Sequence, residues 1–175
     1  MPKTFSVQIP TSPYLKHFIC KEFGHPIQIN NQSLIGVFMI GILEKQNFHV
    51  HMPQEQKNYR YLYFTEKITC IAPLSLIRNF GFTVKEDHVI QLNRFFEEYF
   101  DHELYLYVKR NTKQGHRYAG YKQAIESFAA LYHIVLEETI SFEALKKMEY
   151  RYRIKKENKS VDDLSSPVKQ AASLF

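Results

Sequence analysis

The chain has 175 residues, of which 45% are hydrophobic and 15% aromatic, which is enough to bury a core and excludes a disordered protein. Lys and Arg number 23 against 18 Asp and Glu, which gives a modest net charge of +5. An anionic partner would therefore bind only where the basic residues form a local cluster. The two cysteines form no disulfide framework, the N-terminus lacks the apolar core of a signal peptide, and the longest apolar run, LIGVFMIGIL, is too short to cross a bilayer. We therefore expect a cytoplasmic protein without a membrane segment.

Two helices are predicted in the first quarter of the chain. Ser12 followed by Pro13 is typical of a helix start, and Gly24 is typical of its end. A second helix is predicted from Ser33 to about Gln46. Its apolar residues recur at helical spacing on one face: Ile35, Phe38, Met39, Ile42 and Leu43.

The next segments alternate between apolar and polar residues. Residues 47–53 (NFHVHMP) and 58–73 (NYRYLYFTEKITCIAP) are rich in Tyr, Phe, Ile and Thr with a period of two. The polar loop QEQKN separates them. This pattern predicts a small antiparallel β-hairpin or meander.

The second half of the chain is predicted to be helical. Thr83 and Glu86 form a capping box ahead of one helix, and a further helix is expected from about Tyr118 to His133. Ser141 then precedes a last helix, FEALKKMEYRYRIKKE, whose basic residues gather toward its end as the helix dipole favours. The apolar spacing stops after Asn158, so residues 158–169 are expected to be a flexible linker.

Together these elements predict an α+β fold that is mainly α-helical, with the small antiparallel β-hairpin or meander and a helix-turn-helix-like C-terminal half. The expected division is an N-terminal α/β lobe (residues 1–82), a helical and basic lobe (83–157) and a flexible tail (158–175).

Signals for catalysis are absent from the sequence. There is no dinucleotide fingerprint, phosphate-binding loop, nucleophile elbow or HExxH motif. His49 and His51 would share one face of a strand, but with Cys70 they make only one of the two ligand pairs of a structural zinc site. We therefore expect no enzyme activity, no catalytic residue, no metal and no cofactor.

A cluster of basic residues favours double-stranded DNA as a partner. The last predicted helix carries Lys146, Lys147, Tyr150, Arg151, Arg153 and Lys156, mainly away from its apolar stripe. A second cluster precedes it and includes Lys113 and Arg117. Clustered cations bind phosphates, interleaved tyrosines can stack on sugar or base, and the last of two helices joined by a short turn could enter a major groove. The alternative is an ordinary amphipathic helix with a solvated basic face.

The chain ends on QAASLF, an ending that a disordered tail normally avoids because exposed Leu and Phe gain nothing. It resembles the peptide by which bacterial polymerases, clamp-loader subunits and repair proteins dock on the replicative sliding clamp. Gln170, Ser173, Leu174 and Phe175 match the six-residue form of that motif, with two alanines as spacers. The resemblance implies that Leu174 and Phe175 enter a hydrophobic pocket of the clamp and that Gln170 binds beside it. A tail folded onto its own domain, and a tail with no role, are the alternatives.

These patterns predict a non-enzymatic DNA-binding accessory protein of bacterial replication, repair or a mobile element, tethered to the sliding clamp by its C-terminal peptide. One alternative is a helix-turn-helix transcription regulator with an incidental tail. Another is a structural or protein-interaction component of a phage.

Overall fold

The computed structural model describes residues 4–43, 63–81, 84–112 and 119–171. The chain forms, in order, β1 (Thr4–Thr11), α1 (Pro13–Phe23), β2 (Ile27–Gln28), α2 (Leu34–Ile42), β3 (Glu66–Pro73), α3 (Leu74–Phe80), α4 (Glu86–Asn111), α5 (Ala119–Leu131) and α6 (Phe142–Ala171). The fold is α+β and mainly helical, as the sequence predicted.

The elements divide into two compact units. Unit 1 comprises Met1–Glu98 together with Tyr132–Ile134, and unit 2 comprises Tyr99–Leu131 together with Val135–Phe175. The division falls inside α4, between Glu98 and Tyr99, whereas a boundary between residues 82 and 83 was expected from the sequence. The difference arises because residues of the first half of α4 pack within unit 1: the Phe95 ring stacks 5.2 Å from Phe38, and the Phe96 ring lies 5.8 Å from Phe23.

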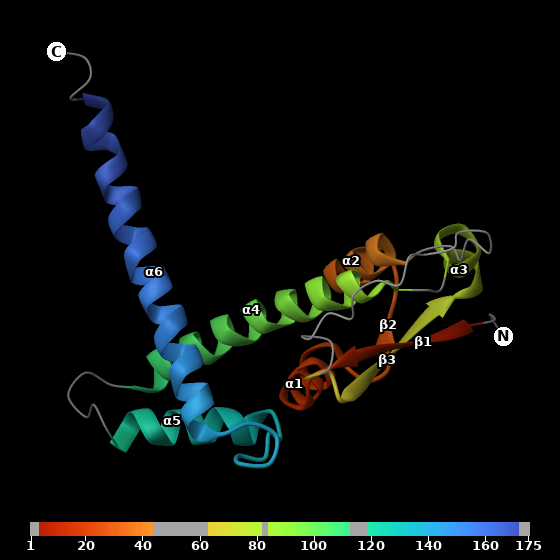
Figure 1. Ribbon diagram of the computed structural model, residues 1–175, viewed down its shortest axis with the longest axis horizontal. Coiled ribbons are helices and arrows are strands. Elements are labelled where there is room, and N and C mark those ends of the chain that lie inside the picture. The colour runs from red at the N-terminus through yellow and green to blue at the C-terminus, as the bar shows by residue number, and fades with distance from the viewer. Residues whose placement is uncertain (1–3, 44–62, 82–83, 113–118, 172–175) are drawn as a thin grey trace. The chain divides into compact units, whose positions relative to one another are not determined.

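Unit 1 is built around a small mixed sheet in which β3 lies between β1 and β2 (Figure 1). β1 pairs antiparallel with β3, Val7 opposite Cys70 and Ile9 opposite Ile68, and β2 pairs parallel with β3. Alternate residues of β3 are buried, in keeping with the period of two that predicted this strand.

The hairpin that was expected to include β3 is only partly described by the structure. The segment 47–53 that was to pair with it lies outside the described residues, and the antiparallel partner in the structure is the distant strand β1. Among the described residues the sheet is mixed, because β2 pairs parallel with β3.

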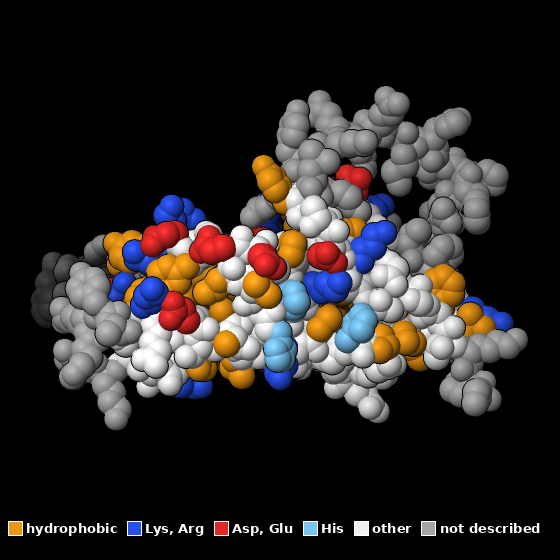
Figure 2. Space-filling view, turned by 90° about the horizontal axis from the view of Figure 1, so that it is seen from below, with side chains coloured by type: hydrophobic (Ala, Val, Ile, Leu, Met, Phe, Trp, Pro, Cys, Tyr) orange, Lys and Arg blue, Asp and Glu red, His pale blue; other side chains and the backbone are white. Residues whose placement is uncertain are grey.

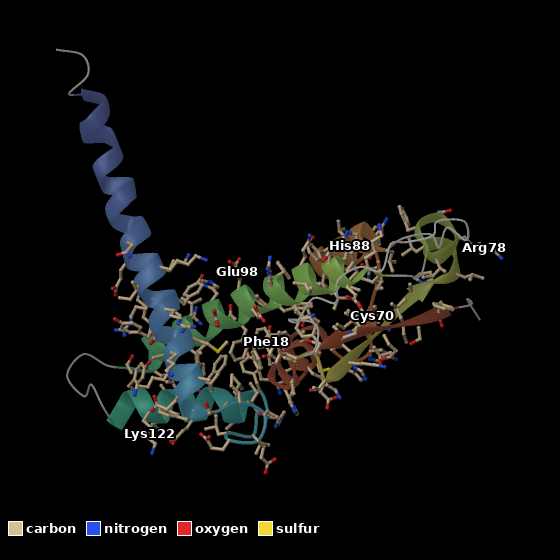
Figure 3. All side chains as sticks on the ribbon, viewed as in Figure 1. Phe18, Cys70, Arg78, His88, Glu98 and Lys122 are labelled. Carbon is tan, nitrogen blue, oxygen red and sulfur yellow. The ribbon has the colours of Figure 1, made fainter. Side chains whose placement is uncertain are left out.

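Helices α1 and α2 bury the faces that their sequences predicted. Leu15, Phe18 and Ile19 of α1 are fully buried, and Figure 3 shows Phe18 and Cys70 among the labelled side chains of this unit. At the start of α2, the Ser33 hydroxyl accepts a hydrogen bond from the Gly36 amide at 3.1 Å, a standard N-cap. A Cβ at Gly36 would lie 2.0 Å from the carbonyl oxygen of Asn30, so only glycine fits there.

A buried polar cluster joins β1 to α4 within unit 1. The Thr11 hydroxyl donates to the Asn93 side-chain oxygen at 2.7 Å, and the Asn93 amide donates to the carbonyl oxygens of Pro10 and Val89, each at 2.9 Å. Every polar atom of the Asn93 side chain therefore has a partner, which makes its burial tolerable.

Unit 2 contains the second half of α4 with α5 and α6. Aromatic rings form its core: Phe100 packs edge-on against Phe128 at 5.4 Å, and Tyr107 meets the same ring at 5.6 Å. Helices α5 and α6 confirm the predicted helix pair, but residues 132–141 connect them, which is longer than the turn of about three to four residues in DNA-binding helix-turn-helix motifs.

The segment that was expected to be a flexible linker is helical in the structure. Residues 158–169, predicted to be flexible, continue α6, which ends at Ala171. The apolar spacing stops after Asn158 although the backbone helix continues, so the periodicity of the sequence did not locate the end of this helix.

Candidate nucleic-acid interface

Helix α6 carries most of the predicted DNA-binding residues, and its start is fixed locally. The Ser141 hydroxyl accepts a hydrogen bond from the Ala144 amide at 3.2 Å, as expected for an N-cap, and Glu143 stands in the first turn, where the helix dipole favours a negative charge. Leu145 and Glu149 are buried one turn apart. Their side of α6 therefore faces the interior of unit 2, and the opposite side faces solvent.

The solvent-facing side of α6 combines basic and apolar residues. Lys147 and Arg151, one turn apart, are exposed, and neither has an ion-pair partner within the described part of the chain. Tyr150 is 54% exposed and Ile154 is 37% exposed. Lys146 differs, because its ammonium lies 3.4 Å from the Glu143 carboxylate. We call Lys147, Tyr150, Arg151 and Ile154 the outward face.

The remaining two predicted residues of α6, Arg153 and Lys156, lie elsewhere. Both line a groove of about 630 Å³ within unit 2, contributed by α4, α5 and α6. The other residues that line it are Tyr105, Val108, Lys109, Thr112, Tyr121, Glu149 and Glu157. The structure thus separates the predicted set into an outward face and a groove.

A buried carboxylate forms part of the groove wall. The Glu149 side chain is 3% exposed, accepts a hydrogen bond from the Tyr121 hydroxyl at 2.7 Å and lies 3.5 Å from the Arg153 Nε. Burial, together with the hydrogen bond and the negative charge of Glu149, raises the pKa of Tyr121 well above its usual range. Tyr121 therefore keeps its proton and remains a donor at physiological pH.

The second predicted basic cluster is only partly described. Lys113 and Arg117 lie outside the described residues. Lys122, from the same stretch of sequence, points from α5 into solvent (Figure 3) and lies 3.7 Å from Glu126 on the next turn. On the face drawn in Figure 2, acidic and basic side chains are interspersed and do not form a field of one sign. That face therefore offers no broad positive surface to DNA.

The C-terminal peptide stays a prediction. Gln170 falls in the last turn of α6, and Ser173, Leu174 and Phe175 lie outside the described residues.

Of the three residues considered for zinc, the structure describes one. His49 and His51 lie outside the described residues, and Cys70 is buried in β3, where burial raises the pKa of its thiol to about 12. No group of three or more His, Cys, Asp or Glu suited to a metal occurs among the residues that the structure describes.

Sequence reasoning missed the groove residues Tyr105, Tyr121 and Glu149. One signal was available, because Glu149 and Arg153 are an acid and a base four residues apart on a helix. The partnership with Tyr121 depends on how α5 packs on α6, and no local pattern encodes it.

Comparison with known proteins found no matching family model, no matching curated protein and no matching solved structure. In the part of the chain that the structure describes, no helix combines the length and the apolar character needed to span a bilayer.

Proposed function

We propose that this chain is a cytoplasmic, non-enzymatic DNA-binding accessory protein of bacterial replication, repair or a mobile element, tethered to the sliding clamp by its C-terminal residues. The observation that supports DNA binding is the outward face of α6. Lys147 and Arg151 are exposed one turn apart without ion-pair partners among the described residues, so their charges are available to phosphates. Tyr150 between them supplies a ring for sugar or base contacts.

The DNA interface is tested by the double substitution Lys147→Ala, Arg151→Ala. We expect weaker duplex binding by fluorescence anisotropy and a salt-dependence slope reduced by about two, one for each lost phosphate contact. The matched control is Lys67→Ala, Arg78→Ala, which removes the same charge from exposed positions of unit 1. If both double variants reduce the slope equally, the effect reflects net charge alone and α6 is not the interface.

The clamp contact is tested separately by Leu174→Ala, Phe175→Ala. Burial of the two side chains on a partner contributes about 1.5–3 kcal/mol each, part of which is lost in ordering the peptide, so we expect a dissociation constant on the order of micromolar. Calorimetry with a bacterial clamp should show binding by the wild-type chain and none by the variant, with bare-DNA affinity unchanged. Ala171→Ser, at a spacer position, is the control and should bind normally.

Absence of clamp binding by the wild-type chain would leave the regulator with an incidental tail as the better account. The exposed apolar groups Tyr150 and Ile154 favour a second candidate, a protein-interaction component. That candidate predicts no salt-dependent DNA binding and loss of a protein partner on Ile154→Ser.

A further inference from the structure

The groove of unit 2 has the size of a small-molecule site. Its volume of about 630 Å³ falls within the range of roughly 300–1,000 Å³ that is usual for ligand pockets. Its lining is unusually polar for such a pocket, because three cations and two carboxylates stand among only a few apolar groups. That composition selects a charged ligand.

Two of the cations are available to a ligand. The Lys109 ammonium lies 5.5 Å from the centre of the Tyr105 ring, and the Lys156 ammonium lies 5.7 Å from the centre of the Tyr152 ring. Within the described residues neither ammonium has an ion-pair partner. The tyrosine rings restrain the two lysines without neutralising them, so an anion between α4 and α6 would meet two unpaired charges.

The third cation is held in place by its neighbours. The Arg153 Nε lies 3.5 Å from the Glu149 carboxylate, and the guanidinium carbon lies 5.5 Å from the centre of the Tyr150 ring. Glu149 is engaged by Arg153 and by the Tyr121 hydroxyl at 2.7 Å, so its charge is already compensated. Its repulsion of an incoming anion is correspondingly reduced.

We propose that this groove binds a nucleotide, whose phosphate meets Lys109 and Lys156 and whose base lies against the rings of Tyr105 and Tyr121. A phosphate group accepts charge-assisted hydrogen bonds from cations such as these two lysines, and aromatic side chains are the usual stacking partners of a base. The site goes beyond the proposed function, since it needs neither a duplex nor a clamp. The nucleotide has two possible sources, a free mononucleotide or the 5′-phosphorylated end of a single strand.

The test uses the full chain and calorimetry with four probes: adenosine 5′-monophosphate, adenosine, inorganic phosphate and a short single-stranded oligonucleotide with a 5′-phosphate. We expect adenosine 5′-monophosphate to bind more tightly than adenosine or phosphate. In the Lys147→Ala, Arg151→Ala chain, where the outward face no longer binds phosphates, tighter binding of the phosphorylated oligonucleotide than of the mononucleotide assigns the site to strand ends. The reverse order assigns it to free nucleotides.

Variants locate the site. Lys109→Ala and Lys156→Ala should each weaken nucleotide binding by about ten- to a hundredfold, the usual effect of losing a charge-assisted hydrogen bond. Lys67→Ala, at an exposed position of unit 1, should leave it unchanged. The proposal is overturned if neither phosphorylated probe binds, if phosphate alone binds as tightly as the nucleotide, or if Lys67→Ala weakens binding as much as the groove variants. Failure of duplex or clamp binding has no bearing on these outcomes.

Discussion

The two units bury polar groups in opposite ways. In unit 1, Asn93 and Thr11 are uncharged, fully buried and hydrogen-bonded to each other and to the backbone. In unit 2, the buried group is the carboxylate of Glu149, which lies beside a groove and is held by Tyr121 and Arg153. A neutral, satisfied cluster fixes the position of a strand against a helix, whereas a buried charge at a groove wall holds a cation where a ligand can reach it.

The largest expected effect is a loss of stability in one unit when a ring of its core is removed. Phe100→Ala should cost unit 2 about 3–5 kcal/mol, because Phe100 is fully buried and packs on Phe128. Amide hydrogen exchange should then show lost protection in α5 and α6 while β1 and β3 keep theirs. The matched variant Phe18→Ala should give the reverse pattern, since Phe18 packs on Tyr132 within unit 1. Equal loss throughout would show that the units unfold together.

The next effect compares how much the buried polar groups of the two units contribute to stability. Asn93→Ala leaves the Thr11 hydroxyl and the Pro10 carbonyl without their partner and should cost about 2–4 kcal/mol in urea unfolding. Glu149→Gln keeps the shape and an acceptor for Tyr121, so we expect a change within about 1 kcal/mol. Similar losses in the two variants would remove the distinction between the units.

A smaller, pH-dependent effect belongs to unit 1. The pKa of the Cys70 thiol rises from 9.0 to about 12 on folding, because the strand buries it. The unfolded chain therefore releases this proton first, and stability that is complete below about pH 9 should fall by about 1.4 kcal/mol per pH unit up to about pH 12. In Cys70→Ala this contribution disappears, so the difference in unfolding free energy between variant and wild type should shrink as the pH rises. Parallel pH curves would contradict the assignment.

The helices of unit 1 could be predicted because their signals are local. Leu15, Phe18 and Ile19 recur at helical spacing, and the structure buries all three. Strand β1 was missed because Pro10 interrupts its alternation, although an edge strand tolerates proline and β1 is an edge strand. Its pairing with β3 joins residues as far apart as Thr4 and Pro73, a register that no local pattern specifies.

The sequence predicted one cluster of basic residues, whereas the structure divides them between the outward face of α6 and the groove of unit 2. The sequence identified the basic residues of α6, but which side of the helix each occupies depends on the face that packs in unit 2. Burial of Leu145 and Glu149 directs Lys147 outward, and Arg153 and Lys156 line the groove. The extension of α6 beyond Asn158 was not predicted, because the apolar period that indicated this helix stops there in the sequence.

Unit 1 includes Tyr132–Ile134, so it cannot be completed during synthesis until the ribosome has made these residues. Strand β1 is synthesised first, yet its partner Pro73 emerges much later, and the contacts of Phe18 and Glu22 with Tyr132 wait for α5 as well. Such long-range closure slows folding, whereas α5 and α6 are neighbours in sequence. A nascent chain that stops at Glu98 would therefore leave Phe18 without its Tyr132 ring, a surface for chaperones to recognise.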